Sequence, residues 1–169
     1  MNRKRITLIT FTAALTAIVF VLTAYLHIPS HVGFVHIGDG VIYLAACMLP
    51  LPYAIFVGAV GGALADLLSG FAIWAPGTVI IKAIGVLFFT RRKNFVSLRN
   101  IFALIPAALI CIFGYYAYDA LIIGSFVSAL AGIPGYIMQC VLSSALFVAL
   151  GFSFDKAKFK NKILGEPKK

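Results

Sequence analysis

The chain has 169 residues, 62% of them hydrophobic, and its mean hydropathy is +1.04. A water-soluble domain of this length could not bury so many apolar side chains, which excludes an ordinary soluble fold. The net charge of +9 does not indicate a nucleic-acid partner, because every Lys and Arg except Lys82 falls in one of three short segments, residues 3–5, 91–99 and 156–169. Since backbone polar groups in lipid must be satisfied internally, we expect an all-α integral membrane protein.

Six apolar segments predict six transmembrane helices that form a single membrane domain over residues 1–169. The first segment is longer than the apolar region of a signal peptide, so we expect it to be retained. A Leu-Pro-Leu-Pro sequence at 49–52 separates the second span from the third, because proline lacks a donor and restricts the residue before it. At about 20 residues per span, no room is left for a soluble catalytic domain. The expected spans are residues 6–27, 39–49, 53–70, 76–90, 100–121 and 134–154.

The three basic segments predict the orientation of the chain. If the N-terminus is cytoplasmic, four spans return the chain to the cytoplasm at residues 91–99, and six spans return it at residues 156–169. All three basic segments then lie inside, as the positive-inside rule requires. Five or seven spans would place the last basic segment on the side opposite the first. We therefore expect both termini to be cytoplasmic.

Four ionisable side chains lie within or beside the expected spans. Asp39 opens the second span, and Asp66 and Asp119 lie near the external ends of the third and fifth. Lys82 lies in the fourth span at a depth similar to that of Asp66, so an Asp66–Lys82 ion pair is feasible between neighbouring antiparallel helices. Intramembrane charges usually line a cavity or pathway. Two structural roles stay open: an ion pair that only holds helices together, and Asp39 as a helix N-cap.

Aromatic and amide side chains gather in the same external half of the expected bundle. Flat rings beside a few hydrogen-bonding groups suit a small polar aromatic ligand. Aromatic rings at this depth are also typical of an interfacial belt, which is the alternative interpretation. The side chains of this set are Tyr43, Trp74, Tyr115, Tyr136 and Gln139.

Small residues indicate where helices approach one another. Gly58 and Gly62 in the third span predict close helix packing, and Ala13 and Ala17 on the first span predict either packing or a docking surface for a partner helix. Three isolated cysteines have no spacing for a disulfide framework or a metal site, so we expect neither. The chain also lacks a G-x-x-x-x-G-K-[ST] phosphate loop and is not expected to hydrolyse ATP.

Three stretches resemble the substrate-binding S components of energy-coupling factor (ECF) vitamin transporters. They are HIGDGVIYLAA at 36–46, GAVGGALADLLSG at 58–70 and WAPGTVIIK at 74–82. The chain is most similar to the branch that includes the riboflavin, hydroxymethylpyrimidine and pyridoxine S components. The likeness covers nearly the whole chain and includes the pattern Ala13-xxx-Ala17.

The resemblance implies a bacterial plasma-membrane protein that binds a small heteroaromatic B vitamin or precursor. Pyridoxine or hydroxymethylpyrimidine is favoured, and riboflavin is the further candidate. It implies that Ala13 and Ala17 dock on a transmembrane T component driven by two ATPase subunits, after which the loaded S component topples to release vitamin inside. ATP would bind only to those partners, and this chain would carry no cofactor and no catalytic residue. The implied external pocket contains His36, Asp39, Trp74, Lys82, Tyr115, Asp119, Tyr136 and Gln139, to which the charge and aromatic patterns add Tyr43 and Asp66.

Two other classes of protein remain possible from the sequence. A stand-alone small transporter or channel would move substrate without ATPase partners. An intramembrane aspartyl protease needs paired aspartates, which Tyr118-Asp119 and Gly38-Asp39 could supply. That family has G-x-G-D after its Y-D motif, whereas this chain has His36 in place of the first glycine and the two motifs in reverse order.

Overall fold

The computed structural model describes residues 3–29, 34–92 and 94–160, and in these ranges the chain is predominantly helical. The all-α prediction is confirmed. Lys93 and the last part of the third basic segment, residues 161–169, lie outside the described residues. The helices are α1 (Arg3–Ala24), α2 (Gly38–Met48), α3 (Leu51–Leu68), α4 (Ala75–Val86), α5 (Leu98–Ile123), α6 (Phe126–Ala129) and α7 (Ile133–Lys156), with 3-10 turns η1 (Ala72–Trp74) and η2 (Leu130–Gly132).

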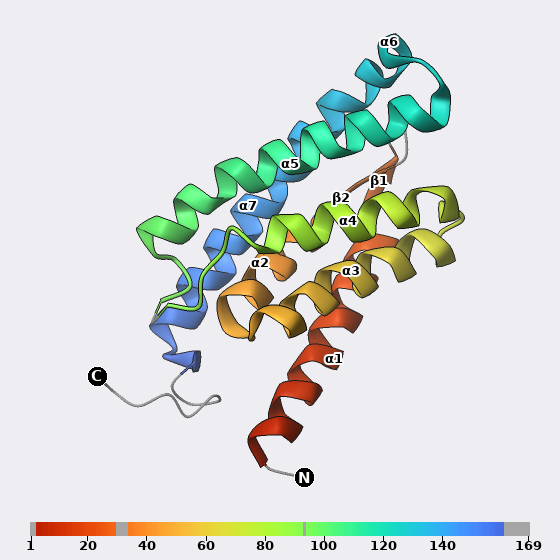
Figure 1. The fold of residues 1–169 in the computed structure, drawn as a ribbon. Coiled ribbons are helices and arrows are strands. Elements are labelled where there is room, and N and C mark those ends of the chain that lie inside the picture. The colour runs from red at the N-terminus through yellow and green to blue at the C-terminus, as the bar shows by residue number, and fades with distance from the viewer. Residues whose placement is uncertain (1–2, 30–33, 93, 161–169) are drawn as a thin grey trace.

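A helix lies over each of the six segments expected to span the membrane. By length and composition alone, four helical segments could cross it: Lys4–Ala24, Leu51–Leu68, Leu98–Ile123 and Phe126–Lys156. The other two, α2 and the η1–α4 segment, are apolar but shorter. The start of α1 and the end of α7 lie at one end of the bundle, and α6 lies at the opposite end (Figure 1).

The first helix ends at Ala24 rather than near His27, because the chain turns into a short antiparallel ribbon of β1 (His27–Pro29) and β2 (Phe34–His36). The ribbon pairs His27 with His36 and Pro29 with Phe34. Three-residue strands are too short to produce an alternating pattern, so the sequence did not predict them.

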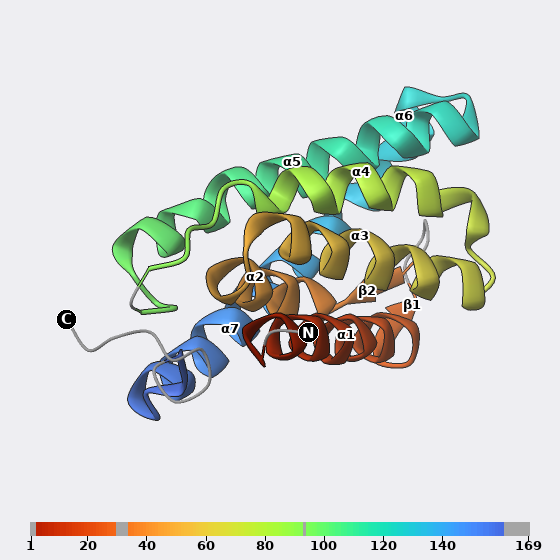
Figure 2. The same ribbon diagram turned by 60° about the horizontal axis from the view of Figure 1, so that its bottom comes forward.

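Helix α2 occupies the centre of the bundle. All of its residues are buried, and it packs against α1, α3 and α7 (Figure 2). Glycines on α3 allow the close packing that their spacing predicted. A Cβ atom added at Gly58 would lie 3.0 Å from Ile42 Cγ2 of α2, and one added at Gly62 would lie 2.7 Å from Thr78 Cγ2 of α4. Larger side chains at these two positions would push α3 away from its neighbours.

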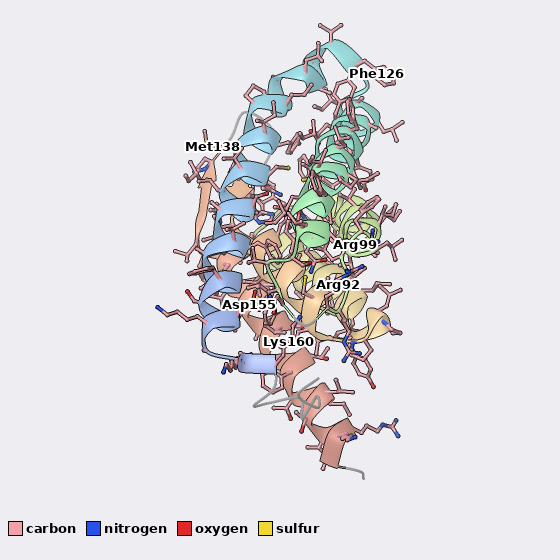
Figure 3. All side chains as sticks on the ribbon, turned by 90° about the vertical axis from the view of Figure 1, so that its left-hand side faces the viewer. Arg92, Arg99, Phe126, Met138, Asp155 and Lys160 are labelled. Atoms are coloured by element: carbon pink, nitrogen blue, oxygen red, sulfur yellow. The ribbon has the colours of Figure 1, made fainter. Side chains whose placement is uncertain are left out.

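Polar contacts fix the loop between α4 and α5 to the end of α7. Both carboxylate oxygens of Asp155 accept backbone hydrogen bonds, from Phe95 N at 2.8 Å and Val96 N at 3.0 Å. Lys160 Nζ donates to the Arg92 carbonyl at 2.6 Å. Figure 3 shows Arg92, Asp155 and Lys160 toward one end of the bundle and Phe126 at the other. The described parts of the second and third basic segments therefore share one end.

Candidate ligand-binding site

A cavity of about 30 Å³ lies at the end of the bundle opposite this basic cluster. Its walls come from β2, the last turn of α3, the η1 turn and helices α4, α5 and α7. Five of the ten residues predicted to bind ligand line it, and three further residues were not predicted. The lining residues are Phe34, His36, Asp66, Phe71, Trp74, Thr78, Tyr115 and Tyr136.

Aromatic rings form most of the cavity wall. The ring centroids of Phe34 and Phe71 are 4.9 Å apart, and those of Phe71 and Trp74 are 5.6 Å apart. On the other side, Tyr115 of α5 stacks on Tyr136 of α7 with centroids 5.2 Å apart and an interplanar angle of 19°. The cavity is therefore bounded by ring faces and edges, which suit a flat aromatic guest.

The Asp119 carboxylate joins two parts of this wall. One oxygen accepts a hydrogen bond from Trp74 Nε1 at 2.9 Å, and the other accepts one from the Tyr136 hydroxyl. Asp119 is fully buried near the end of α5. Its two bonds therefore hold the η1 turn and the first turn of α7 against each other.

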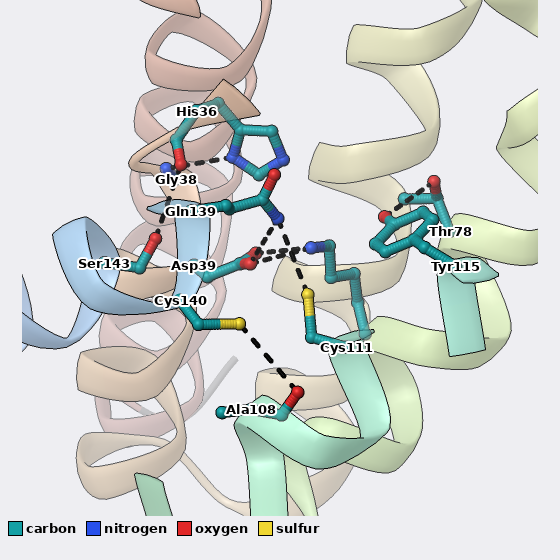
Figure 4. Close-up of polar contacts among 11 residues, drawn as sticks. His36, Gly38, Asp39, Thr78, Ala108, Cys111, Tyr115, Gln139, Cys140 and Ser143 are labelled. Carbon is teal, nitrogen blue, oxygen red and sulfur yellow. Dashed lines mark hydrogen bonds and ion pairs between the residues drawn. The ribbon is translucent and has the colours of Figure 1, made fainter. Parts of the chain in front are cut away.

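A buried ion pair lies beside the cavity (Figure 4). Lys82 Nζ lies 2.7 Å from Asp39 Oδ1 and 2.8 Å from Asp39 Oδ2, and Gln139 Nε2 donates to Oδ2 at 2.9 Å. The ammonium group also lies 5.1 Å from the centroid of the Tyr115 ring. Three helices, α2, α4 and α7, thus meet through one polar cluster.

The Asp66–Lys82 ion pair that the sequence made feasible does not form, because Lys82 pairs with Asp39 instead. The Lys82 side chain reaches from α4 to the first turn of α2, whereas Asp66 lines the cavity. The N-cap role considered for Asp39 is also wrong: Ile37 is the N-cap residue of α2, and it makes no side-chain cap hydrogen bond.

His36 is a neutral part of the cavity wall. Its Nδ1 accepts a hydrogen bond from Gly38 N at 3.2 Å, so the ring proton lies on Nε2. Burial is the main cause that lowers the pKa of the imidazole to about 4; the Asp39 charge opposes this shift and the Lys82 charge adds to it. At neutral pH this side chain therefore carries no charge.

Asp66 differs from the other two acidic residues at this end. It is 5% exposed, and its Oδ2 has no hydrogen-bond partner among the described residues. The nearby hydroxyls of Thr78 and Tyr115 bond to each other at 3.0 Å. The burial of a carboxylate oxygen without a hydrogen-bond donor lowers the stability of the fold. Asp66 Oδ2 is therefore a strong candidate for contact with a ligand.

Tyr43 lies away from the cavity, in the apolar core. Its ring stacks on Phe89 with centroids 4.5 Å apart and meets Phe147 edge-on at 6.2 Å. Asp39, Lys82 and Gln139 lie next to the cavity wall rather than in it. Of the lining residues that were not predicted, Thr78 has a readable signal, since it precedes Lys82 by four positions and shares its helix face. Phe34 and Phe71 have none.

The two alanines on α1 are exposed, and neither lines the cavity. Ala13 borders an open groove of about 440 Å³ between α1 and α3, whose other walls are almost entirely apolar. Two threonine hydroxyls bond within the helix: that of Thr12, in the groove wall, to the Leu8 carbonyl, and that of Thr16, one turn later, to the Thr12 carbonyl. The groove therefore presents apolar surface. Its remaining walls are Ile9, Thr12, Pro52, Tyr53 and Phe56.

Comparison with known families is consistent with the resemblance noted from the motifs. The chain matches the family model described as ECF-type riboflavin transporter, S component, over residues 3–156. A comparison with curated proteins finds no significant match. Among the described residues, no cluster of three or more His, Cys, Asp or Glu side chains could hold a metal ion. Because the family match spans most of the chain and coincides with its apolar helices, the protein belongs to the S components of ECF transporters, membrane proteins of vitamin uptake and not enzymes.

Proposed function

We propose that this S component captures a flat heteroaromatic B vitamin or precursor in the cavity between β2, η1 and α7. The observation that carries the proposal is the cavity itself, where aromatic rings surround the Asp66 carboxylate, whose Oδ2 has no partner among the described residues. We favour pyridoxine and hydroxymethylpyrimidine because they are smaller than riboflavin. Riboflavin stays a candidate because the description of the matched family model names that vitamin.

Entry of any of these ligands requires the cavity to expand. Its volume of about 30 Å³ compares with roughly 300–1,000 Å³ for sites that enclose small molecules. The bonds from Asp119 to Trp74 and Tyr136 hold the walls together, so the η1 turn and the start of α7 separate as the ligand enters. The ring then stacks on Phe71 and Trp74, and Asp66 accepts its donors.

Binding of the vitamin is expected to quench or shift the fluorescence of Trp74, the single tryptophan of the chain. The indole lines the cavity, so a stacked heteroaromatic ring changes its environment. The experiment titrates the detergent-purified protein with pyridoxine, hydroxymethylpyrimidine and riboflavin, with calorimetry as the independent measure of binding. Trp74→Phe supplies the blank. A ligand that saturates the protein in the calorimeter but leaves the emission unchanged would place Trp74 outside the site.

In the proposed topology α1, α2, α3, α4, α5 and α7 all cross the membrane, and both termini are cytoplasmic. The clustering of Arg92 and Lys160 at one end of the bundle supports this orientation. Helices α2 and α4 are short, but α2 is buried along its whole length, so neighbouring helices rather than lipid surround it. The cavity then opens to the external side.

Single cysteines test this topology in a background without the three native cysteines. Ile73→Cys, at a position 55% exposed beside the cavity, is expected to react with a membrane-impermeant maleimide on intact cells. Arg99→Cys, at the exposed start of α5, is expected to react only after the membrane is permeabilised. The reverse pattern would show that the cavity faces the cytoplasm and would remove the proposed uptake role.

Transport in this proposal depends on a T component and two ATPase subunits, because this chain has no phosphate-binding loop. The loaded protein docks through Ala13 and Ala17 and topples to release its vitamin into the cytoplasm. The family match supports this partnership and gives no support to a stand-alone channel or a protease. Vitamin accumulation in liposomes that contain only this chain would overturn the dependence on partners.

A further inference from the structure

The cavity end of the protein carries an excess of negative charge. Asp39, Asp66 and Asp119 all lie there, and Lys82 is the only Lys or Arg between residues 6 and 90 of the sequence. The sequence has no Lys or Arg at all between residues 100 and 155. With every carboxyl group ionised, this end therefore holds two more negative charges than Lys or Arg can neutralise.

The contacts show which carboxylate lacks compensation. Asp39 is paired with Lys82 and receives a further bond from Gln139. Asp119 accepts two hydrogen bonds, one on each oxygen. Asp66 alone has a buried oxygen, Oδ2, with neither a cation nor a donor on it among the described residues. His36 cannot supply the charge, since it accepts a bond from Gly38 N and stays neutral.

The aromatic rings that line the cavity favour a cationic ligand, as the Asp66 carboxylate does. The faces of aromatic rings are negative and attract cations, most strongly when water is excluded. Phe34, Phe71, Trp74, Tyr115 and Tyr136 surround a cavity whose one uncompensated group is a carboxylate. A positively charged guest would gain from both, whereas an anionic guest would be repelled by both.

We propose that Asp66 makes the cavity selective for cationic, donor-bearing heteroaromatic ligands, such as aminomethylpyridines and protonated aminopyrimidines, and excludes phosphorylated forms. The ligand's N–H groups donate to Asp66 Oδ2 in a charge-assisted bond, and its ring stacks on the surrounding aromatic faces. The inference rests on the proposed function, because it concerns the same cavity. In this proposal Asp66 is the residue that determines which ligand charge the cavity prefers.

Matched ligands that differ in one substituent, and through it in charge or hydrogen-bond donors, test the selectivity. The pyridine series is pyridoxamine, pyridoxine and pyridoxine 5′-phosphate; the pyrimidine series is hydroxymethylpyrimidine, its 4-oxo analogue and its phosphate; the flavin pair is riboflavin and its 5′-phosphate. Dissociation constants are measured calorimetrically on the full chain in detergent. In the pyridine or pyrimidine series, we expect the amine to bind about tenfold more tightly than its neutral partner, and the phosphate to be the weakest ligand.

Asp66→Asn keeps the shape of the side chain and removes its charge. In this variant the affinity for the amine is expected to fall about tenfold while that for the neutral partner changes less than about threefold. Its melting temperature is expected to equal or exceed that of the unaltered protein, because an uncompensated buried charge has been removed. An unchanged amine preference in Asp66→Asn would overturn the role of Asp66.

The outcomes separate this inference from the function on which it rests. Tight binding of riboflavin together with no binding of any amine would refute the charge selectivity and leave vitamin capture intact. An amine that binds no better than its neutral partner in the unaltered protein would do the same, and this measurement needs no variant. Absence of binding by every member of the three series would refute the proposed function itself.

Discussion

Replacement of Lys82 by methionine is expected to lower the free energy of unfolding by about 3–5 kcal/mol, because it leaves the Asp39 carboxylate buried without a cation. Asp39 is 1% exposed and Lys82 is 5% exposed, so water cannot replace the lost partner. Gln139 would still donate to Asp39, but one neutral donor does not balance a charge in this position. The expected result is a large drop in the melting temperature of the purified protein in detergent.

A double variant distinguishes the lost pair from simple loss of packing. Lys82→Met combined with Asp39→Asn removes both charges and keeps an oxygen that accepts from Gln139, so we expect it to recover most of the lost stability. Lys156→Met, at an exposed position on the last turn of α7, is the matched control and is expected to change little. If Lys82→Met has the same melting temperature as the unaltered protein, the ion pair does not stabilise the fold.

Ala13→Trp is expected to abolish copurification with the T and ATPase subunits while the vitamin affinity stays within about twofold of the unaltered protein. Ala13 is exposed beside the groove between α1 and α3, and an indole there would fill space that a closely approaching helix needs. The groove lies apart from the cavity, so ligand binding has no reason to change.

Two further tryptophan variants locate the docking face on α1. Ala17→Trp lies one turn from Ala13 on the same face and is expected to have the same effect. Ile18→Trp is the control, since residue 18 is 45% exposed but lies on a different face of α1. Assembly that survives both alanine substitutions, or is lost equally in Ile18→Trp, would show that docking does not use this surface.

The sequence predicted the helices well because hydrophobic length and charge placement decide them. It could not predict which acid pairs with Lys82. Depth along a helix follows from residue number, which put Asp66 at the level of Lys82, but the direction in which a side chain points depends on how the helices rotate against each other. The central position of α2 brings Asp39 to Lys82, and no pattern within one helix encodes that position.

The sequence predicted only part of the candidate site, because it shows the depth of a residue along a helix but not the direction of its side chain. Charged and polar aromatic residues at the external ends of spans are visible in a sequence, and His36, Trp74 and Tyr136 indeed line one cavity. Phe34 and Phe71 also line it, but a phenylalanine in an apolar chain has no signal that separates a cavity wall from a lipid contact. Tyr43 shows the converse: a tyrosine at a suitable depth stacks on Phe89 and lines a separate, smaller cavity with Asp39 and Lys82.

The enclosure of α2 has a consequence for how the chain enters the bilayer during synthesis. Its 11 residues extend about 16 Å, roughly half the hydrocarbon thickness, and they include Asp39. The transfer of such a segment into the hydrocarbon core releases too little free energy for it to leave the translocon by itself. We expect it to enter the bilayer only after Lys82 of α4 can pair with Asp39 and the later helices can cover α2. In the proposed topology, we therefore expect α2 and α4 to integrate as a group, after more than half of the polypeptide has been made.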